Sequence, residues 1–443
     1  MQPRHAATHL PQPSKHRLTV NRHRGFKIAV TVVVALALSS GVAVAERLRQ
    51  LDANIDVLHG VNDLLGLNRP DQEKGDGGGA PLDPFGGRSV NILITAIDTR
   101  DGDNAAVVRE AGPKSATWTP SLLNDVNMIA HISKDRSRVD VVAIPRDTLI
   151  PIPACVRPDR SVAEPLRQEQ INASFSRGAA GDSANKTEGV ACVMKTIEQV
   201  TNIRLDTFIL VDFAGFANVV DGLGGIDICV PDGLVGKESK INLPPGMNHL
   251  DGSTALAFAR TRKGTTSAGR LDGSDTSRIS RQQELIATVI SEFMDSGNLQ
   301  SLPKLNATAT AITKSLYVGE ELGSITSLAG LAYVLRDIKM ANVSLFTAPW
   351  GEAPSDKDRV ILAEWGTPGR FGGLNAQEVF QVMAADQPVP GTTPYKAAHP
   401  ETPASTEPST PPPDSSSKEP GATTDLPPSD DEFVTPLKAP TKC

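Results

Sequence analysis

Aspartate and arginine side chains gather where short apolar runs begin or end. Five of these charged residues are Asp98, Arg100, Asp125, Arg146 and Asp147. Carboxylate oxygens are the ligands that Mg²⁺ prefers, and guanidinium groups bind phosphate oxygens through paired hydrogen bonds. These residue types together predict a site for a metal ion and a phosphorylated ligand.

Two β-rich runs, residues 127–132 and 139–144, are separated by the polar turn SKDRSR and predict an antiparallel hairpin. In such a hairpin the start of the first strand lies beside the end of the second, so we expect Asp125 and Arg146 to share one edge of a sheet. If the strand that ends before Asp98 runs parallel to the second strand, Asp98 joins them. Binding sites in α/β folds tend to lie at strand ends.

More arginines follow in two later segments. The run LDGSTALAFARTRKG places Arg260 and Arg262 two residues apart, on one face if the segment is extended. The run DTSRISRQQ sets Arg278 and Gln282 four residues apart on a predicted helix, with Arg281 between them. Converging arginines indicate a multiply charged ligand such as a pyrophosphate, although any one of them alone is more typical of a solvated surface charge.

Several common catalytic motifs are absent from the sequence: GxxxxGK[ST], GxGxxG after a strand, HExxH and GxSxG. Their absence argues against nucleotide, dinucleotide, zinc-hydrolase and serine-hydrolase functions. The sparse cysteines form no CxxC pair, which argues against a zinc site. Two of Cys155, Cys192 and Cys229 could form a disulfide outside the membrane, or all three could be buried apolar side chains.

The elements that must position these residues follow an alternating order. Residues 89–97, SVNILITAI, form a continuous apolar run typical of a strand buried on both faces. Residues 190–200 and 285–293 repeat apolar side chains at helical spacing. The alternation of strands and helices predicts an α/β fold with a central mixed sheet and helices on both of its faces.

The N-terminal region predicts a membrane anchor. Residues 1–27 form a basic arm, and residues 28–45 form an uncharged apolar run just long enough to cross a bilayer. The positive flank predicts a cytoplasmic N-terminus and export of everything after Glu46. The sequence Ala43-Val44-Ala45 also fits the cleavage site of a signal peptide.

Two further segments flank the predicted folded part. Residues 46–87 are expected to form an extracytoplasmic stalk and linker, and residues 389–443, rich in Pro, Ser, Thr and acidic residues, a disordered tail. The net charge of -7, without a continuous basic stripe, argues against a nucleic-acid partner.

These motifs resemble the LytR-CpsA-Psr family of cell-wall enzymes, in its actinobacterial type. The resemblance spans residues 88–388 and is carried by IPRDT, followed at long range by ARTRK and DxxRxxRQ, with INASFSRG and VVDGLGGIDICVP between them. It implies a single three-layer α/β/α domain behind one transmembrane helix, in the cell membrane.

The resemblance implies a phosphotransferase that moves a phosphate-linked glycopolymer from a polyprenyl-pyrophosphate carrier to a peptidoglycan hydroxyl. The glycopolymer would be arabinogalactan, a teichoic acid or another wall glycan. Asp98 and Asp125 would bind Mg²⁺, or Mn²⁺ in its place. Arg146, Arg260, Arg262 and Arg278 would hold the phosphates, with Gln282 nearby. We further predict Asp147 and Asp275 as catalytic residues, and Arg100, Arg281 and Gln282 as substrate-binding residues. Asp147, Asp275 or Asp98 would be the general base.

Two other functions are compatible with the same residues. A pyrophosphatase would cleave the polyprenyl pyrophosphate without an acceptor, and a regulator would bind the lipid or the wall without catalysis. The sequence also departs from the family pattern, with Ala96-Ile97-Asp98 in place of Gly-x-Asp and Leu123-Asn124-Asp125-Val126 in place of Arg-Ser-Asp-Thr. One phosphate-binding arginine is therefore missing, and Arg270 is a candidate replacement.

Apolar residues around position 213 have two interpretations. Phe208, Phe213, Phe216 and Val219 are core residues by default, because most large apolar side chains are buried. The family resemblance implies instead that some of them line a groove for the lipid tail.

Overall fold

A computed structural model of the protein describes residues 45–73, 83–99, 104, 122–261, 263–271, 275–294, 302–354, 356–362, 371, 373–398, 434–435 and 443, some of them by backbone alone. The chain divides into two units, residues 1–50 and 51–443. In the first unit only residues 45–50 are described, and they are helical. The predicted arm at 1–27 and most of the predicted anchor, 28–44, lie outside the described residues. Within the described part no helix is long and apolar enough to cross a membrane.

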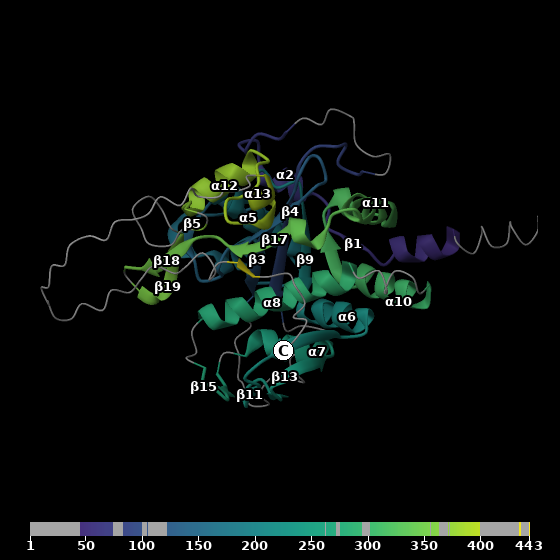
Figure 1. The fold of residues 1–443 in the computed structure, drawn as a ribbon. Coiled ribbons are helices and arrows are strands. Elements are labelled where there is room, and N and C mark those ends of the chain that lie inside the picture. Colours follow the sequence, from purple (N-terminus) through teal and green to yellow (C-terminus); the bar gives the residue numbers. More distant parts are fainter. Residues whose placement is uncertain are drawn as a thin grey trace, which may run out of the picture. The chain divides into compact units, whose positions relative to one another are not determined.

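The second unit is built on a mixed eight-stranded sheet, in the order β1-β16-β9-β2-β3-β4-β17-β20. Figure 1 labels β1, β9, β3, β4 and β17 of this sheet. The pairs β1–β16, β2–β9 and β4–β17 are parallel, and the other neighbouring pairs are antiparallel. The strands are β1 (Asp56–Val57), β16 (Leu316–Val318), β9 (Thr207–Asp212), β2 (Val90–Asp98), β3 (Leu123–Ile132), β4 (Val139–Ala143), β17 (Val343–Thr347) and β20 (Val434–Thr435). The predicted mixed sheet and the hairpin of β3 and β4 are confirmed.

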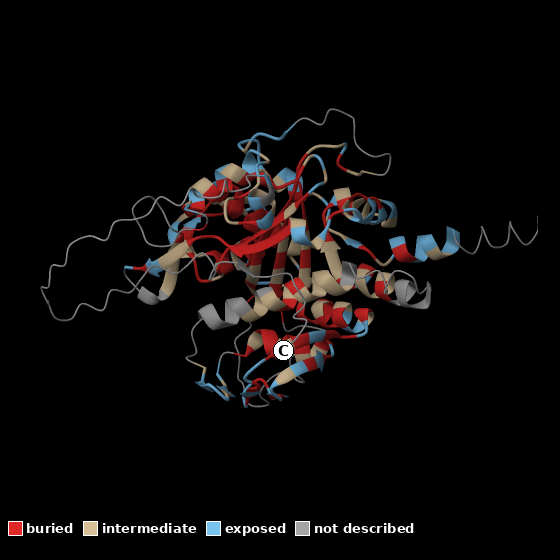
Figure 2. Cartoon of the chain, in the orientation of Figure 1, coloured by how far each residue is buried: buried red, intermediate tan, exposed pale blue. Residues whose placement is uncertain are grey.

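Helices cover both faces of this sheet. On one face Leu93 and Val142 pack with buried residues of α5 (Lys186–Thr201) and α12 (Ala376–Ala384). On the other face Ile92 and Val141 pack with α8 (Asp275–Met294) and α11 (Ile325–Leu335). Successive residues of a strand point to opposite faces, which is why β2 contributes to both cores. Figure 2 shows the buried residues concentrated on the strands and on the helix faces that meet them.

A third hydrophobic cluster lies beside α8. It joins α6 (Phe213–Leu223) and α7 (Gly252–Arg260) to the small sheets of β10 (Ile226–Val230), β13 (Gly246–Leu250), β11 (Leu234–Gly236) and β12 (Ile241–Leu243). A Cβ atom on Gly252 would lie 2.2 Å from the carbonyl oxygen of Ala217, so α7 can pack this closely on α6 only with glycine there. Phe213 belongs to this cluster and Phe208 to the core under α5, and both are buried.

Shorter elements complete the unit. They are α2 (Val61–Leu65), β5 (Leu149–Ile152), β6 (Cys155–Val156), β7 (Val162–Ala163), β8 (Leu166–Gln170), η1 (Ile171–Ala173), α4 (Ser174–Gly178), β14 (Thr265–Thr266), β15 (Gly269–Arg270), α10 (Leu302–Thr313), η2 (Glu320–Leu322), η3 (Met340–Asn342), β18 (Trp350–Ala353), β19 (Asp356–Leu362) and α13 (Thr393–Ala398).

The segment predicted as a stalk is partly folded into the second unit. Val61 and Leu65 of α2 are 4% and 2% exposed and belong to the core under α5. Strand β1 adds to the edge of the main sheet through β16. The stalk prediction is therefore wrong for these residues.

The boundary predicted at residue 389 is also wrong. Val389 is fully buried, α13 follows it, and β20 pairs with β17. The composition of residues 389–443 is an average over a long segment. A few of its residues, such as Val389 and the two residues of β20, can still pack on the domain.

Two disulfides are present in the described residues. Cys155 pairs with Cys192, joining β6 to α5, and Cys229 of β10 pairs with Cys443. The first pair is one of the combinations left open by the sequence. The second joins Cys229 to a cysteine in the segment predicted as a disordered tail, a pairing that the sequence did not predict.

Candidate active site

The edge of the sheet where β2 and β4 end and β3 begins carries the first predicted residues. Both β2 and β4 run antiparallel to β3, so they end at the same edge. Arg146, three residues past β4, places Nη1 2.7 Å from Oδ1 of Asp125. The two side chains are 12% and 19% exposed. The expectation that Asp125 and Arg146 share this edge is confirmed.

Asp125 occupies a β-bulge. Ala96 of β2 lies opposite Val126, but the next residue, Ile97, lies opposite Asn124, so Asp125 is the extra residue of β3. A bulge breaks the regular alternation of a strand and redirects the side chain of the extra residue. This local irregularity directs Asp125 toward Arg146 at the sheet edge.

Buried amide groups tie this edge to the segment INASFS. Asn124 Nδ2 donates to Asn127 Oδ1 at 2.6 Å, and Asn124 Oδ1 accepts from the backbone N–H of Phe175 at 3.0 Å. The backbone N–H of Asn172 donates to the carbonyl oxygen of Arg146 at 3.2 Å. The motif INASFSRG therefore holds the bulge and the backbone of Arg146 in place, a role that the sequence alone did not assign.

Asp98 lies at the same edge. It is the last residue of β2, opposite Leu123, and is partly exposed. Among the described residues no three Asp, Glu, His or Cys side chains come together in a group that could hold a metal ion. Mg²⁺ commonly takes one or two protein carboxylates and completes its shell with water and phosphate oxygens. Asp98 and Asp125, at one edge of the sheet, fit a Mg²⁺ site in which water and the oxygens of a phosphorylated ligand supply the remaining ligands.

Asp147 lies between two arginines. Its Oδ2 is 3.2 Å from Nε of Arg146, and its Oδ1 is 3.6 Å from Nη1 of Arg359. With the amide of Gln170 oriented to satisfy both neighbours, its nitrogen donates to Asp147 at 2.6 Å and its oxygen accepts from Arg359 at 3.2 Å. Asp147 is therefore placed to hold the guanidinium group of Arg146 in position.

Arg359 was missed by the sequence analysis. It lies on β19, and the next residue, Val360, forms an isolated bridge with Thr148 and donates its N–H to the carbonyl oxygen of Asp147 at 3.5 Å. Its surroundings, DKDRV, resemble an ordinary polar loop in the sequence. No local pattern could connect residue 359 with residue 147, and only the fold brings them together.

Arg260 is the last residue of α7, whose first turn is capped by Asp251 through its side chain. The guanidinium carbon of Arg260 lies 4.8 Å from the centre of the Phe213 ring. The backbone becomes extended only at Thr261. From the sequence, Arg260 and Arg262 are predicted to lie on one face if their segment is extended. Arg260 is helical, so that arrangement is not formed at Arg260.

The helix predicted from DTSRISRQQ is present as α8. Arg281 donates from Nη2 to the carbonyl oxygen of Thr261, which links α8 to the end of α7. Burial raises the pKa of Glu284, one turn further along, against the opposing charge of Arg281. Gln282 instead lines a pocket at the sheet edge.

This pocket brings Gln282 together with Asp125 and Arg146, and the rest of its lining comes from residues 126–128 and 143–145. Arg146 and Gln282 both carry N–H donors, so the pocket can receive a phosphoryl oxygen between them. Arg270 is exposed on the hairpin of β14 and β15, which pairs with β11.

Four of the predicted site residues lie wholly or partly outside the described residues. Arg100 and Arg262 lie outside the described residues, and for Asp275 and Arg278 only the helical backbone is described. Their assigned roles stay predictions.

Comparisons with known proteins agree on one family. The family model described as the LytR_cpsA_psr family matches residues 76–355. "Cell wall biosynthesis protein LcpA" of Corynebacterium glutamicum is 27% identical over 59% of this chain and 50% of its own length. "Polyisoprenyl-teichoic acid--peptidoglycan teichoic acid transferase TagV" of Bacillus subtilis is 25% identical over 41% of this chain and 42% of its own length. The chain thus spans about half the length of these curated relatives.

A solved structure, the "LytR-Csp2A-Psr enzyme from Actinomyces oris", aligns with a TM-score of 0.45 and 16% identity. The alignment covers 73% of this chain and 95% of that one.

Proposed function

The chain belongs to the LytR-CpsA-Psr family, and we propose that it is a membrane-anchored phosphotransferase acting outside the cytoplasm. It moves a phosphate-linked wall glycopolymer from a polyprenyl-pyrophosphate carrier to a hydroxyl group of peptidoglycan. The names of TagV and TagT as teichoic acid transferases support this reaction class. In this chain the supporting observation is the pocket that joins the Arg146–Asp125 ion pair to Gln282.

The reaction is a substitution at phosphorus. A peptidoglycan hydroxyl attacks the phosphorus that bears the glycan, the bond from that phosphorus to the bridging oxygen breaks, and polyprenyl phosphate leaves. Charge neutralisation and positioning supply most of the acceleration in such reactions. Arg146 and Gln282 would donate hydrogen bonds to the reacting phosphate.

The proton of the attacking hydroxyl passes to a carboxylate. Asp147 is poorly placed for this role because it already lies between Arg146 and Arg359. Asp275 on α8 is the candidate that follows, because Asp98 is assigned to the metal. Asp98 and Asp125 would hold Mg²⁺, or Mn²⁺, which would neutralise part of the pyrophosphate charge.

The test uses the full chain in detergent with a synthetic polyprenyl-pyrophosphate-linked glycan and purified peptidoglycan. We expect glycan on the peptidoglycan and an equal amount of polyprenyl phosphate, both abolished by EDTA and restored by Mg²⁺. Release of polyprenyl phosphate at the same rate without peptidoglycan would identify a pyrophosphatase instead. Binding of the lipid without any release would identify a non-catalytic regulator.

A further inference from the structure

A second cavity lies at the edge of the sheet opposite the candidate active site. Arg88 lies two residues before β2, and Arg204 lies three residues before β9, the parallel neighbour of β2. Both therefore stand at the edge where these strands begin, whereas Asp98 stands where β2 ends. Strands rise about 3.3 Å per residue, so the length of β2 separates the two edges by roughly 30 Å.

Three guanidinium groups from separate segments line this cavity, which we call the arginine cavity. Arg69 comes from the loop after α2, and Arg88 and Arg204 come from the loops before β2 and β9. The cavity is open to solvent on one side and has a volume of about 370 Å³, so a phosphate group fits within it. Its other lining residues are Asn62, Gly66, Leu67, Gln72, Leu205, Asp206 and Glu321.

Two of the three arginines are matched by buried carboxylates. Arg69 donates to Glu198 through Nε at 2.9 Å and through Nη2 at 2.6 Å. Arg88 forms an ion pair with Asp206, which also accepts the N–H of Asn91 at 2.7 Å. The side chains of Glu198 and Asp206 are 4% and 3% exposed. Glu198 also accepts the N–H of Leu205 at 2.9 Å, and Asp206 also accepts from Nε2 of Gln72 at 2.9 Å. Each carboxylate is thus occupied by its own arginine and by further donors.

Arg204 has no carboxylate of its own among the described residues. Its Nη1 donates to the carbonyl oxygen of Pro70 at 3.3 Å, and its Nε is buried without a hydrogen-bond partner in the described structure. Burial and the nearby charge of Arg69 lower the pKa of Arg204, against the attraction of Glu198 and Asp206. A guanidinium group that lines a cavity without a carboxylate partner can bind a phosphate oxygen through its accessible N–H groups.

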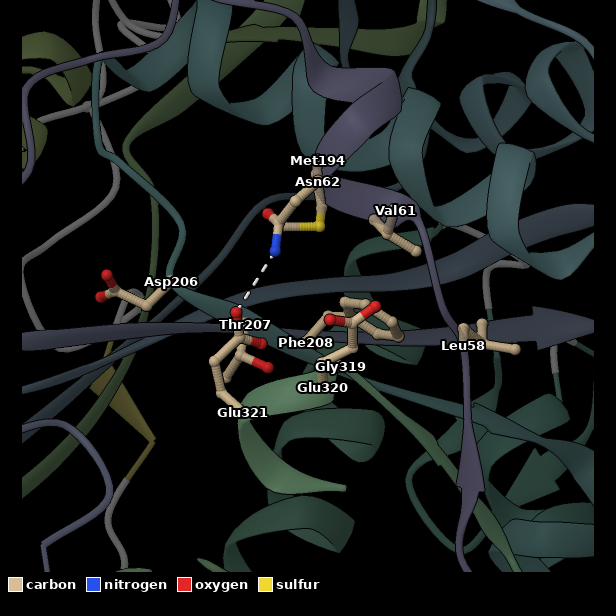
Figure 3. Close-up of a pocket in the computed structure, with 10 residues that line it drawn as sticks. All are labelled: Leu58, Val61, Asn62, Met194, Asp206, Thr207, Phe208, Gly319, Glu320 and Glu321. Carbon is tan, nitrogen blue, oxygen red and sulfur yellow. Dashed lines mark hydrogen bonds between the residues drawn. The ribbon is translucent and has the colours of Figure 1, made fainter. Parts of the chain in front are cut away.

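The rim of the cavity is partly acidic and partly apolar. Figure 3 shows Asn62, Asp206 and Glu321 where they also line a smaller neighbouring pocket, with Asn62 Nδ2 donating to Glu321 Oε1 at 3.2 Å. Glu321 is directed toward Asn62, and it is the only lining carboxylate without an arginine partner among the described residues. Leu67 beside it is fully exposed.

We propose that the arginine cavity binds a phosphate group, belonging either to the headgroup of an anionic phospholipid or to free phosphate. Arg204 supplies the guanidinium group that no carboxylate pairs with among the described residues, and Arg69 and Arg88 line the cavity beside it in ion pairs with Glu198 and Asp206. The exposed Leu67 at the rim would contact the apolar part of a lipid. This binding is independent of the phosphotransfer reaction, because it uses other residues at the opposite edge of the sheet.

The test is calorimetric titration of the full chain in a non-ionic detergent, first with inorganic phosphate and then with dihexanoyl phosphatidylglycerol below its micelle concentration. We expect Arg204→Gln to weaken binding about tenfold or more, the typical effect of losing a hydrogen bond to a charged group. Arg160→Gln is the matched control, since Arg160 is exposed in the turn between β6 and β7. Tighter binding of the lipid identifies a headgroup, and tighter binding of phosphate identifies the free ion.

A second variant keeps the test decisive if Arg204→Gln lowers stability. Glu321→Gln removes the acidic rim charge and should tighten binding of both probes by about a few-fold, because it removes the repulsion between a partly exposed carboxylate and the bound phosphate. Absence of binding by either probe would overturn the proposal. Equal binding by the wild type, Arg204→Gln and Glu321→Gln would overturn it as well.

Discussion

At the scale of single residues, hydrogen bonds hold both the guanidinium group and the backbone carbonyl of Arg146. Its guanidinium group bonds to Asp125 in the bulge and to Asp147 beside it, and its carbonyl oxygen accepts from Asn172. An arginine held in this way loses little conformational freedom when a phosphate binds, which is the structural basis of preorganised charge stabilisation.

Arg146→Lys keeps the charge but removes the planar donor pair. We expect kcat for glycan transfer to fall by roughly 10²–10³, the usual effect of removing one donor to a developing charge. Circular dichroism should show an unchanged fold, and Arg160→Lys should transfer glycan at the wild-type rate. Activity within a few-fold of wild type would show that Arg146 does not contact the reacting phosphate.

The second residue-scale prediction concerns Asp147 and Arg359, which act through Arg146 as positioning residues. Asp147→Asn and Arg359→Gln should each lower kcat by about tenfold with little change in KM, since the reacting groups stay in place but are less well oriented. Because the two side chains are in contact, the double variant should lose less than the product of the single effects. Fully multiplicative losses would mean that the two residues act independently.

At the scale of elements, a buried network fastens the end of α12 to the sheet. Asp386, two residues after α12, accepts from His131 Nε2 at 2.9 Å, from Arg138 Nη2 at 2.8 Å and from the N–H of Lys134 at 3.1 Å. Burial raises the pKa of Asp386, but the hydrogen bonds from His131 and Lys134 and the charges of His131 and Arg138 outweigh it, so the pKa lies below its usual value.

A pKa lowered by folding means that the ionised Asp386 stabilises the protein above the unfolded-state pKa, near 4, and that this contribution disappears as the pH falls through the folded-state pKa. Asp386→Asn should therefore lower the free energy of unfolding by about 1–2 kcal/mol at pH 7. Urea unfolding at pH 7, 5 and 3 should show the difference from wild type shrinking at the lowest pH. A difference that stays constant down to pH 3 would contradict the assignment.

At the scale of the whole molecule, the disulfide between Cys229 and Cys443 joins residues 214 positions apart. It ties the end of the described chain to β10, while β20 pairs with β17 at the edge of the main sheet. A cross-link of this span restricts the unfolded chain strongly, and it stabilises the folded state by roughly 2–4 kcal/mol.

Cys443→Ser should lower the melting temperature of the oxidised protein and remove the Cys229–Cys443 peptide from a non-reducing digest analysed by mass spectrometry. Cys229→Ser should have the same effect on stability, and the double variant should lose no more than either single variant. Unequal effects, or a digest in which Cys229 is linked to another cysteine, would show that the pairing differs.

The sequence by itself determined the features that depend on neighbouring residues. The apolar run of β2, the hairpin of β3 and β4, the helix α8 and the shared edge of Asp125 and Arg146 all follow from side-chain periodicity and turn residues, because the backbone geometry of an element is set within a few residues. The family could be inferred for the same reason, since short motifs such as IPRDT keep their spacing along the chain.

Only the tertiary structure decided which distant residues meet. Five features left no local signal in the sequence. They are the bulge at Asp125, the approach of Arg359 to Asp147, the helical position of Arg260, the burial of Val389 and the pairing of Cys443 with Cys229. Each depends on how whole elements pack to bury their apolar faces. That packing brings together residues more than 200 positions apart, and side chains so distant along the chain do not affect each other's local conformation.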